Sequence, residues 1–315
     1  MLRVLGVIGR RLLALVAVLW ALSFAIFSLL SIAPGSPERA LLGTRPTTPE
    51  TLAAIRDLYH LNEPFLVQYW LWLKGALQFD LGESIQNQQP VTALIAQRAE
   101  VSMNLVVFAF LISLVVGIGL GIIAAVWEKS ALDRAIVALT IIGVSAPAFV
   151  TGILFLYVFG VELAWFPIAG TQDGFRSYVL PAVALAAGML ALITRIMRIS
   201  LIRELKQDHL RFARARGLSP LHVLMNHGVR NAMVPVVTSA GLVFALMLGG
   251  TLLIEIVFSL AGLGSLLVSA TLAKDFPVVQ GLVLLIATAI VLVNLVVDLS
   301  YSLIDPRVRL GAKSA

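Results

Sequence analysis

Six long apolar runs dominate this chain of 315 residues and decide what it can fold into. Each run has roughly twenty residues or more, which is the length that an α-helix needs to cross the hydrocarbon core of a bilayer. Only backbones that satisfy their own hydrogen bonds survive in that core, and this requirement favours helices. We therefore expect an all-α polytopic membrane protein with six transmembrane helices, at about 12–32, 101–127, 135–160, 178–199, 232–258 and 278–304.

The composition agrees with a membrane protein and removes several other classes. Apolar residues make up 59% of the chain and charged residues 13%, against roughly 45–50% and about 25% in soluble domains. The chain has no cysteine, which excludes disulfides, thiolate metal sites and cysteine nucleophiles. The first apolar run is longer than the core of a cleaved signal peptide, so we interpret it as a retained helix.

The basic residues predict the orientation, because cytosolic loops carry an excess of Lys and Arg. With a cytosolic N-terminus, 16 of the 23 basic residues fall inside, but only 6 of the 17 acidic residues do. This distribution predicts cytosolic termini (residues 1–11 and 305–315). The net charge of +6 is then mostly a topology signal, and we expect membrane lipid but no nucleic acid as a partner.

Residues 33–100 form the larger predicted extracytoplasmic segment. Thr48-Pro49-Glu50 is typical of a helix start. A second helix over 65–79 is expected to place five apolar side chains on one face and Trp72 towards the other; the five are Leu66, Tyr69, Trp70, Leu73 and Leu77. This segment is either a cap packed on helix ends or a docking surface for an outside partner, and the residues favour neither interpretation.

An Arg-rich interruption, residues 200–231, separates the fourth and fifth apolar runs; we call it the elbow. We expect the fourth helix to continue through about residue 210. Gly217 then permits a sharp turn. Ser219 and Pro220 suit the start of a second helix that runs to about residue 231. The elbow is predicted to be a compact knob that presents a surface to the cytosol.

The elbow resembles the EAA loop of permease subunits of binding-protein-dependent ABC importers, in the dipeptide/oligopeptide/nickel branch. The matching motifs are Phe212-Ala213-Arg214-Ala215-Arg216-Gly217-Leu218, His227-Gly228-Val229-Arg230-Asn231-Ala232 and Val234-Pro235-Val236-Val237-Thr238. Further matches occur in order along the chain, among them Ala33-Pro34-Gly35-Ser36-Pro37, Asp80-Leu81-Gly82-Glu83-Ser84, Asp275-Phe276-Pro277 and Asp305-Pro306-Arg307. One departure concerns charge: Arg211 stands where the general pattern has an acid, so an ion pair known from acidic relatives does not transfer.

The resemblance implies the fold, the machinery and a location in the bacterial inner membrane. It implies a type I ABC importer transmembrane-domain fold, with a core at 101–304 that forms the pore with a second homologous permease. Two ABC ATPases, which hold ATP and Mg²⁺, are expected beneath it, and a substrate-binding protein outside. This chain has no phosphate-binding loop motif, so we expect no catalysis and no cofactor in it. The expected ATPase-coupling residues are Asp208, Arg211, Phe212, Ala213, Arg214, Ala215, Arg216, Gly217, Leu218 and Leu221.

Few ionisable residues mark the pathway. Glu255 near the outer end of the fifth run and Lys274 with Asp275 before the sixth are candidates for a pathway or gate. Glu255 suits a rim or an interhelix contact as well, and Lys274 and Asp275 suit an ordinary helix start. The resemblance implies di- or oligopeptide cargo, with nickel, glutathione or another small solute as alternatives.

Two other classes have less support in the sequence. An intramembrane protease would use Ser145, but all four histidines fall in predicted loops, so a general base is out of reach. A channel or self-powered carrier would favour clear inverted repeats and charged residues within the spans, which the sequence does not show clearly.

Overall fold

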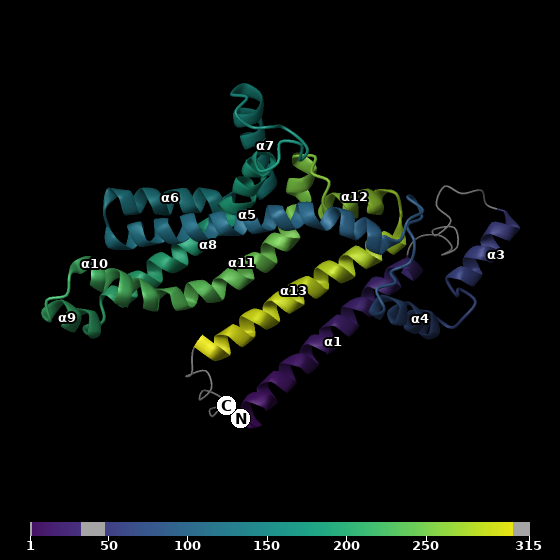
Figure 1. The fold of residues 1–315 in the computed structure, drawn as a ribbon, viewed down its shortest axis with the longest axis horizontal. Coiled ribbons are helices and arrows are strands. Elements are labelled where there is room, and N and C mark those ends of the chain that lie inside the picture. The colour runs from purple at the N-terminus through teal and green to yellow at the C-terminus, as the bar shows by residue number, and fades with distance from the viewer. Residues whose placement is uncertain (1, 33–47, 305–315) are drawn as a thin grey trace. The chain divides into compact units, whose positions relative to one another are not determined.

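The computed structural model describes residues 2–32 and 48–304, and within them the chain is helical (Figure 1). An isolated bridge between Glu83 and Pro90 is the β-type pairing within that described part. The helices are α1 (Leu2–Ile32), α3 (Pro49–Leu58), α4 (Phe65–Leu77), α5 (Val91–Val126), α6 (Ala131–Ser145), α7 (Ala148–Phe155), the π-helix η1 (Leu156–Glu162), α8 (Arg176–Leu205), α9 (Asp208–Ala215), α10 (Pro220–His222), the π-helix η2 (Val223–Val229), α11 (Arg230–Val257), α12 (Leu263–Leu272) and α13 (Phe276–Ile304).

The predicted spans correspond only partly to single helices. Four described helical stretches are long and apolar enough to cross a membrane: Val91–Val126, Arg176–Leu205, Pro220–Val257 and Phe276–Val297. A bent pair of helices makes a fifth candidate, and the apolar part of α1, Leu13–Ser28, is shorter. The count of six spans and the cytosolic termini therefore remain predictions. The tail at 305–315 and the matching motif at 33–37 lie outside the described residues.

The third predicted span, 135–160, is not one straight helix. α6 ends at Ser145, and α7 and η1 continue from Ala148 at an angle of 104° to it. Ala146 has extended backbone angles, φ −88° and ψ 125°. The cause is Pro147, because its ring disfavours the helical conformation in the preceding residue. This segment is a broken span or a re-entrant turn rather than a single crossing helix.

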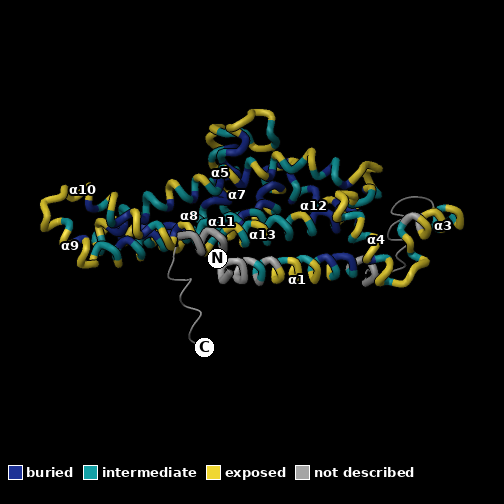
Figure 2. The backbone as a smooth tube through the Cα atoms, turned by 60° about the horizontal axis from the view of Figure 1, so that its bottom comes forward, coloured by how far each residue is buried: buried dark blue, intermediate teal, exposed yellow. Residues whose placement is uncertain are grey.

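The chain divides into two compact units, and unit 2 comprises 103–260 together with 296–315. α8 lies at its centre, in contact with α6, α7 and α11, and carries a long series of buried residues (Figure 2). A Cβ atom added to Gly121 on α5 would lie 2.6 Å from the Cβ of Met197 on α8. Such close backbone approach is what small residues provide in membrane bundles.

Unit 1 comprises 1–102 and 261–295. α1 and α4 meet through aromatic side chains, and the hydroxyls of Ser23 and Tyr69 lie 2.8 Å apart. The packed face of α4 includes Tyr69 and Trp72, whose rings both lie against Phe27. Leu66 and Trp70 are exposed instead. The predicted face is therefore rotated from the observed one, because it included exposed residues and left out Trp72.

The rest of unit 1 forms a small core under the start of α13. Val91 and Leu94 of α5 pack there against residues of α12 and α13, namely Leu266, Ala270, Val278 and Leu282. The start of α3 is as predicted: the Thr48 hydroxyl accepts a hydrogen bond from the Thr51 amide at 3.2 Å. Backbone hydrogen bonding at this helix start and the Thr48 hydroxyl lower the pKa of the Glu50 carboxyl.

Candidate functional site

The elbow folds as a short helix followed by a glycine turn. α8 ends at Leu205 and α9 begins at Asp208, so the predicted continuation to residue 210 is interrupted. Gly217 has φ +78°, a left-handed conformation that glycine adopts without steric cost. The Ser219 hydroxyl then accepts a hydrogen bond from the His222 amide at 3.4 Å, with Pro220 in the first turn. The turn and the helix start are as the sequence predicted.

The second helix of the elbow does not end near residue 231. α10, η2 and α11 follow one another without a break, so one helical stretch extends over Pro220–Val257. The polar start of this stretch therefore joins the apolar span without a break. A displacement at the elbow is therefore connected to a membrane helix through continuous helical backbone.

Apolar contacts fix the inner side of the elbow. Leu210 of α9 is fully buried. A Cβ atom added to Gly228 would meet the side chains of Leu201, Leu205 and Leu210 at 3.4 to 3.6 Å. α8, α9 and η2 therefore meet at one point, and the elbow is a packed knob, as predicted, rather than a loose linker.

A polar cluster joins the same elements. The Glu204 carboxylate on α8 lies 3.0 Å from Nε2 of His209 on α9. It also accepts a hydrogen bond of 2.8 Å from the side-chain amide nitrogen of Asn231 on α11. One carboxylate thus connects three helices, although the cluster is partly exposed and such surface contacts contribute little to stability.

A second polar connection holds α8 to α6, and the sequence analysis missed it. Nε and Nη2 of Arg198 donate to the two carboxylate oxygens of Asp133 at 2.6 and 2.7 Å. Asp133 is buried, and its carboxylate also accepts from the Lys129 amide at 2.9 Å. Ser130 and Asp133 have the spacing of a capping box, which could have identified Asp133 as a helix-start residue. Nothing in the sequence indicated Arg198 as its partner.

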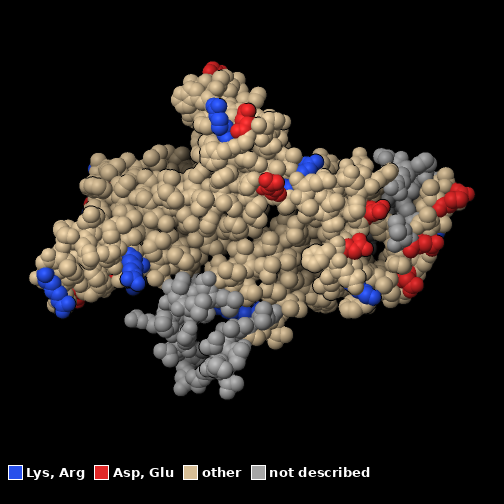
Figure 3. Space-filling model, in the orientation of Figure 1, with Lys and Arg blue, Asp and Glu red and all other residues tan. Residues whose placement is uncertain are grey.

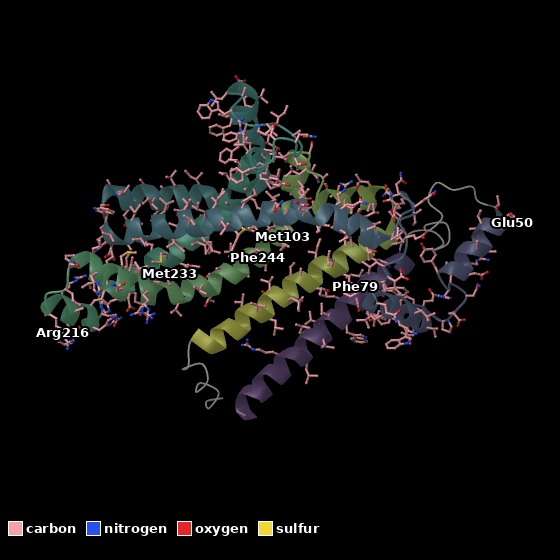
Figure 4. All side chains as sticks on the ribbon, in the orientation of Figure 1. Glu50, Phe79, Met103, Arg216, Met233 and Phe244 are labelled. Atoms are coloured by element: carbon pink, nitrogen blue, oxygen red, sulfur yellow. The ribbon has the colours of Figure 1, made fainter. Side chains whose placement is uncertain are left out.

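The outer side of the elbow is apolar and basic. Phe212 and Leu221 are 68% and 69% exposed. Leu218, which lies between them in the sequence, is exposed as well. Lys and Arg gather at this end of unit 2 (Figure 3), and Arg216 projects from its tip (Figure 4). Arg211 forms an exposed pair with Asp208 at 3.4 Å. Such a pair contributes little, so both side chains stay accessible to a partner.

The candidate pathway residues occupy two different units. Glu255 is fully buried near the end of α11 in unit 2. Lys274 is exposed, with φ +57°. Asp275 is buried in unit 1 and accepts hydrogen bonds from the Ser84 hydroxyl at 2.6 Å and from the amides of Ile85 and Gln86 at 3.1 and 3.2 Å. Asp275 therefore holds the 84–86 turn, and a gating role for these residues stays a prediction.

Comparisons with known proteins agree with this architecture. Residues 117–310 match the family described as binding-protein-dependent transport system inner membrane component. Residues 1–106 match the N-terminal part of such membrane components. This chain belongs to that family, and it is an inner-membrane permease component of an ABC importer of the binding-protein-dependent type.

Individual relatives extend over nearly the whole chain. The glutathione transport system permease protein GsiC of Escherichia coli O6:H1 is 38% identical over 305 residues, 97% of this chain and 99% of that protein. The probable peptide ABC transporter permease protein y4tP of Sinorhizobium fredii is 39% identical over 308 residues, 95% of this chain and 98% of that protein. A crystal structure of an amino acid ABC transporter with histidines is more distant, with 17% identity and a TM-score of 0.49 over 69% of this chain and 94% of that chain.

Proposed function

We propose that this chain imports short peptides, as one of two homologous permease subunits around a shared pathway. Two ABC ATPase subunits bind ATP and Mg²⁺ and dock on the cytosolic side, and a binding protein delivers the peptide from outside. The relatives named for peptide and glutathione transport support this cargo class, since glutathione is itself a short peptide. Glutathione is the second candidate, favoured by the similarity to GsiC over almost the full chain.

The observation that carries the coupling proposal is the contrast between the two sides of the elbow. Its inner side is held by buried Leu210 and by the Glu204 cluster. Its outer side exposes Phe212, Leu221 and several arginines. Exposed aromatic and Arg side chains are typical of protein interfaces. A packed knob with such a surface can pass a displacement of a bound partner on to α8 and α11. The reason is that packed elements switch between arrangements rather than deform continuously.

Reconstitution tests this function. The reconstituted liposomes contain both permeases, the ATPases and the binding protein. We expect dipeptides to accumulate when ATP is supplied on the side of the membrane where the ATPases are bound. Competition with glutathione at low concentration then separates the two cargo candidates, because dipeptide uptake is lost under that condition only if the importer prefers glutathione. If this chain alone concentrates a solute against its gradient, the proposal is wrong.

A further inference from the structure

A cavity of about 520 Å³ lies within unit 1. It is lined by the end of α1, by α4 and the residues before it, by 80–85, and by the start of α13. This size is typical of sites for small ligands. We propose that the cavity binds the free amino terminus of a short peptide, as an organic ammonium, before the peptide enters the pathway.

The charges of the lining favour a cation. Asp80 and Glu83 contribute two carboxylates, and the described lining residues include neither Lys nor Arg. His60 is the basic group among them, and even a protonated His60 leaves the sum negative. Asp and Glu side chains also gather over the α3 and α4 part of unit 1 (Figure 3). This lining attracts an ammonium and repels the carboxylate end of a peptide.

Hydrogen bonding points to a ligand that donates. The Ser84 hydroxyl already donates to Asp275 at 2.6 Å. The Gln68 amide nitrogen donates to the carbonyl of Glu63 at 2.8 Å, and that of Gln280 lies 3.5 Å from the Phe27 carbonyl. Each amide group then offers its oxygen, which accepts. An ammonium supplies three donors and suits a wall made of carboxylates and amide oxygens.

Aromatic rings complete the lining. Phe27 and Trp72 line the cavity with their ring centroids 5.5 Å apart, and Tyr59 lines it as well. A cation over such faces gains a further attraction, strongest for Trp. Leu61, Leu71 and Ile85 add apolar surface for the hydrocarbon part of the ligand.

The wall is preorganised by Asp275. Its buried carboxylate holds the hydroxyl of Ser84 and the amides of the next two residues. The Ser84 oxygen in turn accepts from the Asn87 amide at 2.9 Å. The turn that carries Glu83 is therefore ordered before any ligand arrives, which lowers the entropic cost of binding.

The test is direct binding to the purified full-length chain in nanodiscs, without ATPases. The probe is L-alanyl-L-phenylalaninamide, which has an ammonium and no carboxylate; its N-acetyl form is the neutral match. We expect acetylation to weaken binding about tenfold or more. Glu83→Gln and, as a second variant, Trp72→Leu should each weaken binding of the free amine about fivefold or more. Glu100→Gln removes an exposed carboxylate outside the cavity and should leave binding unchanged.

Equal binding of the free and acetylated probes would overturn the inference, as would absence of binding by either. The inference would also be overturned if the two single variants, Glu83→Gln and Trp72→Leu, are well folded and bind the free amine as tightly as the parent chain. The choice of a peptide probe rests on the proposed function, but the readouts are separate. Failure of ATP-driven uptake counts against the importer, whereas normal uptake with unselective binding counts against this site alone.

Discussion

Arg198 holds Asp133 through two hydrogen bonds of 2.6 and 2.7 Å, and this pair joins α8 to the start of α6. The two residues are 65 positions apart in sequence. The Asp133 side chain is almost fully buried, whereas that of Arg198 is 24% exposed. Arg198 lies on α8, the helix that leads into the elbow, seven residues before the helix ends at Leu205.

Breaking this pair should destabilise unit 2. Asp133→Asn leaves the guanidinium of Arg198 without its charge partner, and Arg198→Met leaves a buried carboxylate. We expect either change to lower the free energy of unfolding by about 2–4 kcal/mol, because a buried charge then lacks compensation. Lys206→Met is the control, since it breaks an exposed pair with Glu128 and should cost less than about 1 kcal/mol. Thermal unfolding in detergent measures the stability of each variant. Equal losses of stability in all three variants would contradict a stabilising role for the Arg198–Asp133 pair.

Gly217 should tolerate only residues that accept its backbone conformation. A Cβ there meets nothing within 4 Å, so the constraint is the φ of +78° rather than space. Gly217→Pro should abolish ATP-driven uptake while leaving membrane insertion intact, because proline fixes φ at about −65°. Gly217→Asn is the matched control, since Asn adopts left-handed angles more readily. Uptake assays at matched expression decide, and normal uptake by the proline variant would remove the coupling role.

The exposed side chains of the elbow should matter for assembly and not for folding. Phe212→Ser and Leu221→Ser alter surface positions, so we expect unchanged unfolding temperature but about tenfold weaker retention of the ATPase subunits. Leu210→Ser is the opposite case: it puts a hydroxyl in a fully buried position and should lower stability by about 2–4 kcal/mol. Co-purification with a quantified ATPase band measures retention of the ATPases, and thermal unfolding measures the stability of each variant. Full retention of the ATPases by the Phe212→Ser, Leu221→Ser double variant would contradict the docking surface.

Two glycines of α5 provide a matched pair for helix packing. Gly121→Ala places its methyl group 2.6 Å from Met197 Cβ, whereas Gly119→Ala meets nothing within 4 Å. We expect the first to lower stability by about 1–3 kcal/mol through overpacking. The second should be neutral or slightly stabilising, since alanine favours helices by about 1 kcal/mol. Unfolding curves of the two variants, recorded side by side, measure the difference; similar behaviour would mean that α5 and α8 are not in close contact.

Local signals in the sequence were sufficient for turns and helix starts. Gly217, Ser219 and the Thr48–Pro49 start all follow from the conformations that these residues prefer. The break after Ser145 was visible in principle, because Pro147 restricts the residue before it. Continuous apolar composition concealed it, since a bent span and a straight one have the same hydropathy.

Long-range partners were beyond the sequence. Asp275 and Ser84 are 191 positions apart, and each alone is typical of an ordinary helix start or turn. Trp72 was placed on the wrong face of α4 because periodicity does not distinguish a face that packs on α1 from one that remains exposed. Pairings of this kind depend on how helices meet, which a single sequence does not encode locally.

We propose that energy enters this chain from a neighbouring ATPase at the elbow, and a crosslinking experiment tests this contact directly. The chain has no cysteine, so Leu221→Cys carries a unique reactive thiol. In membranes that contain the assembled importer, a short thiol-directed photocrosslinker at this position should join the chain to an ATPase subunit. Phe79→Cys, exposed in unit 1, should give no such product. A crosslink to the ATPase from position 79 but not from position 221 would contradict the account.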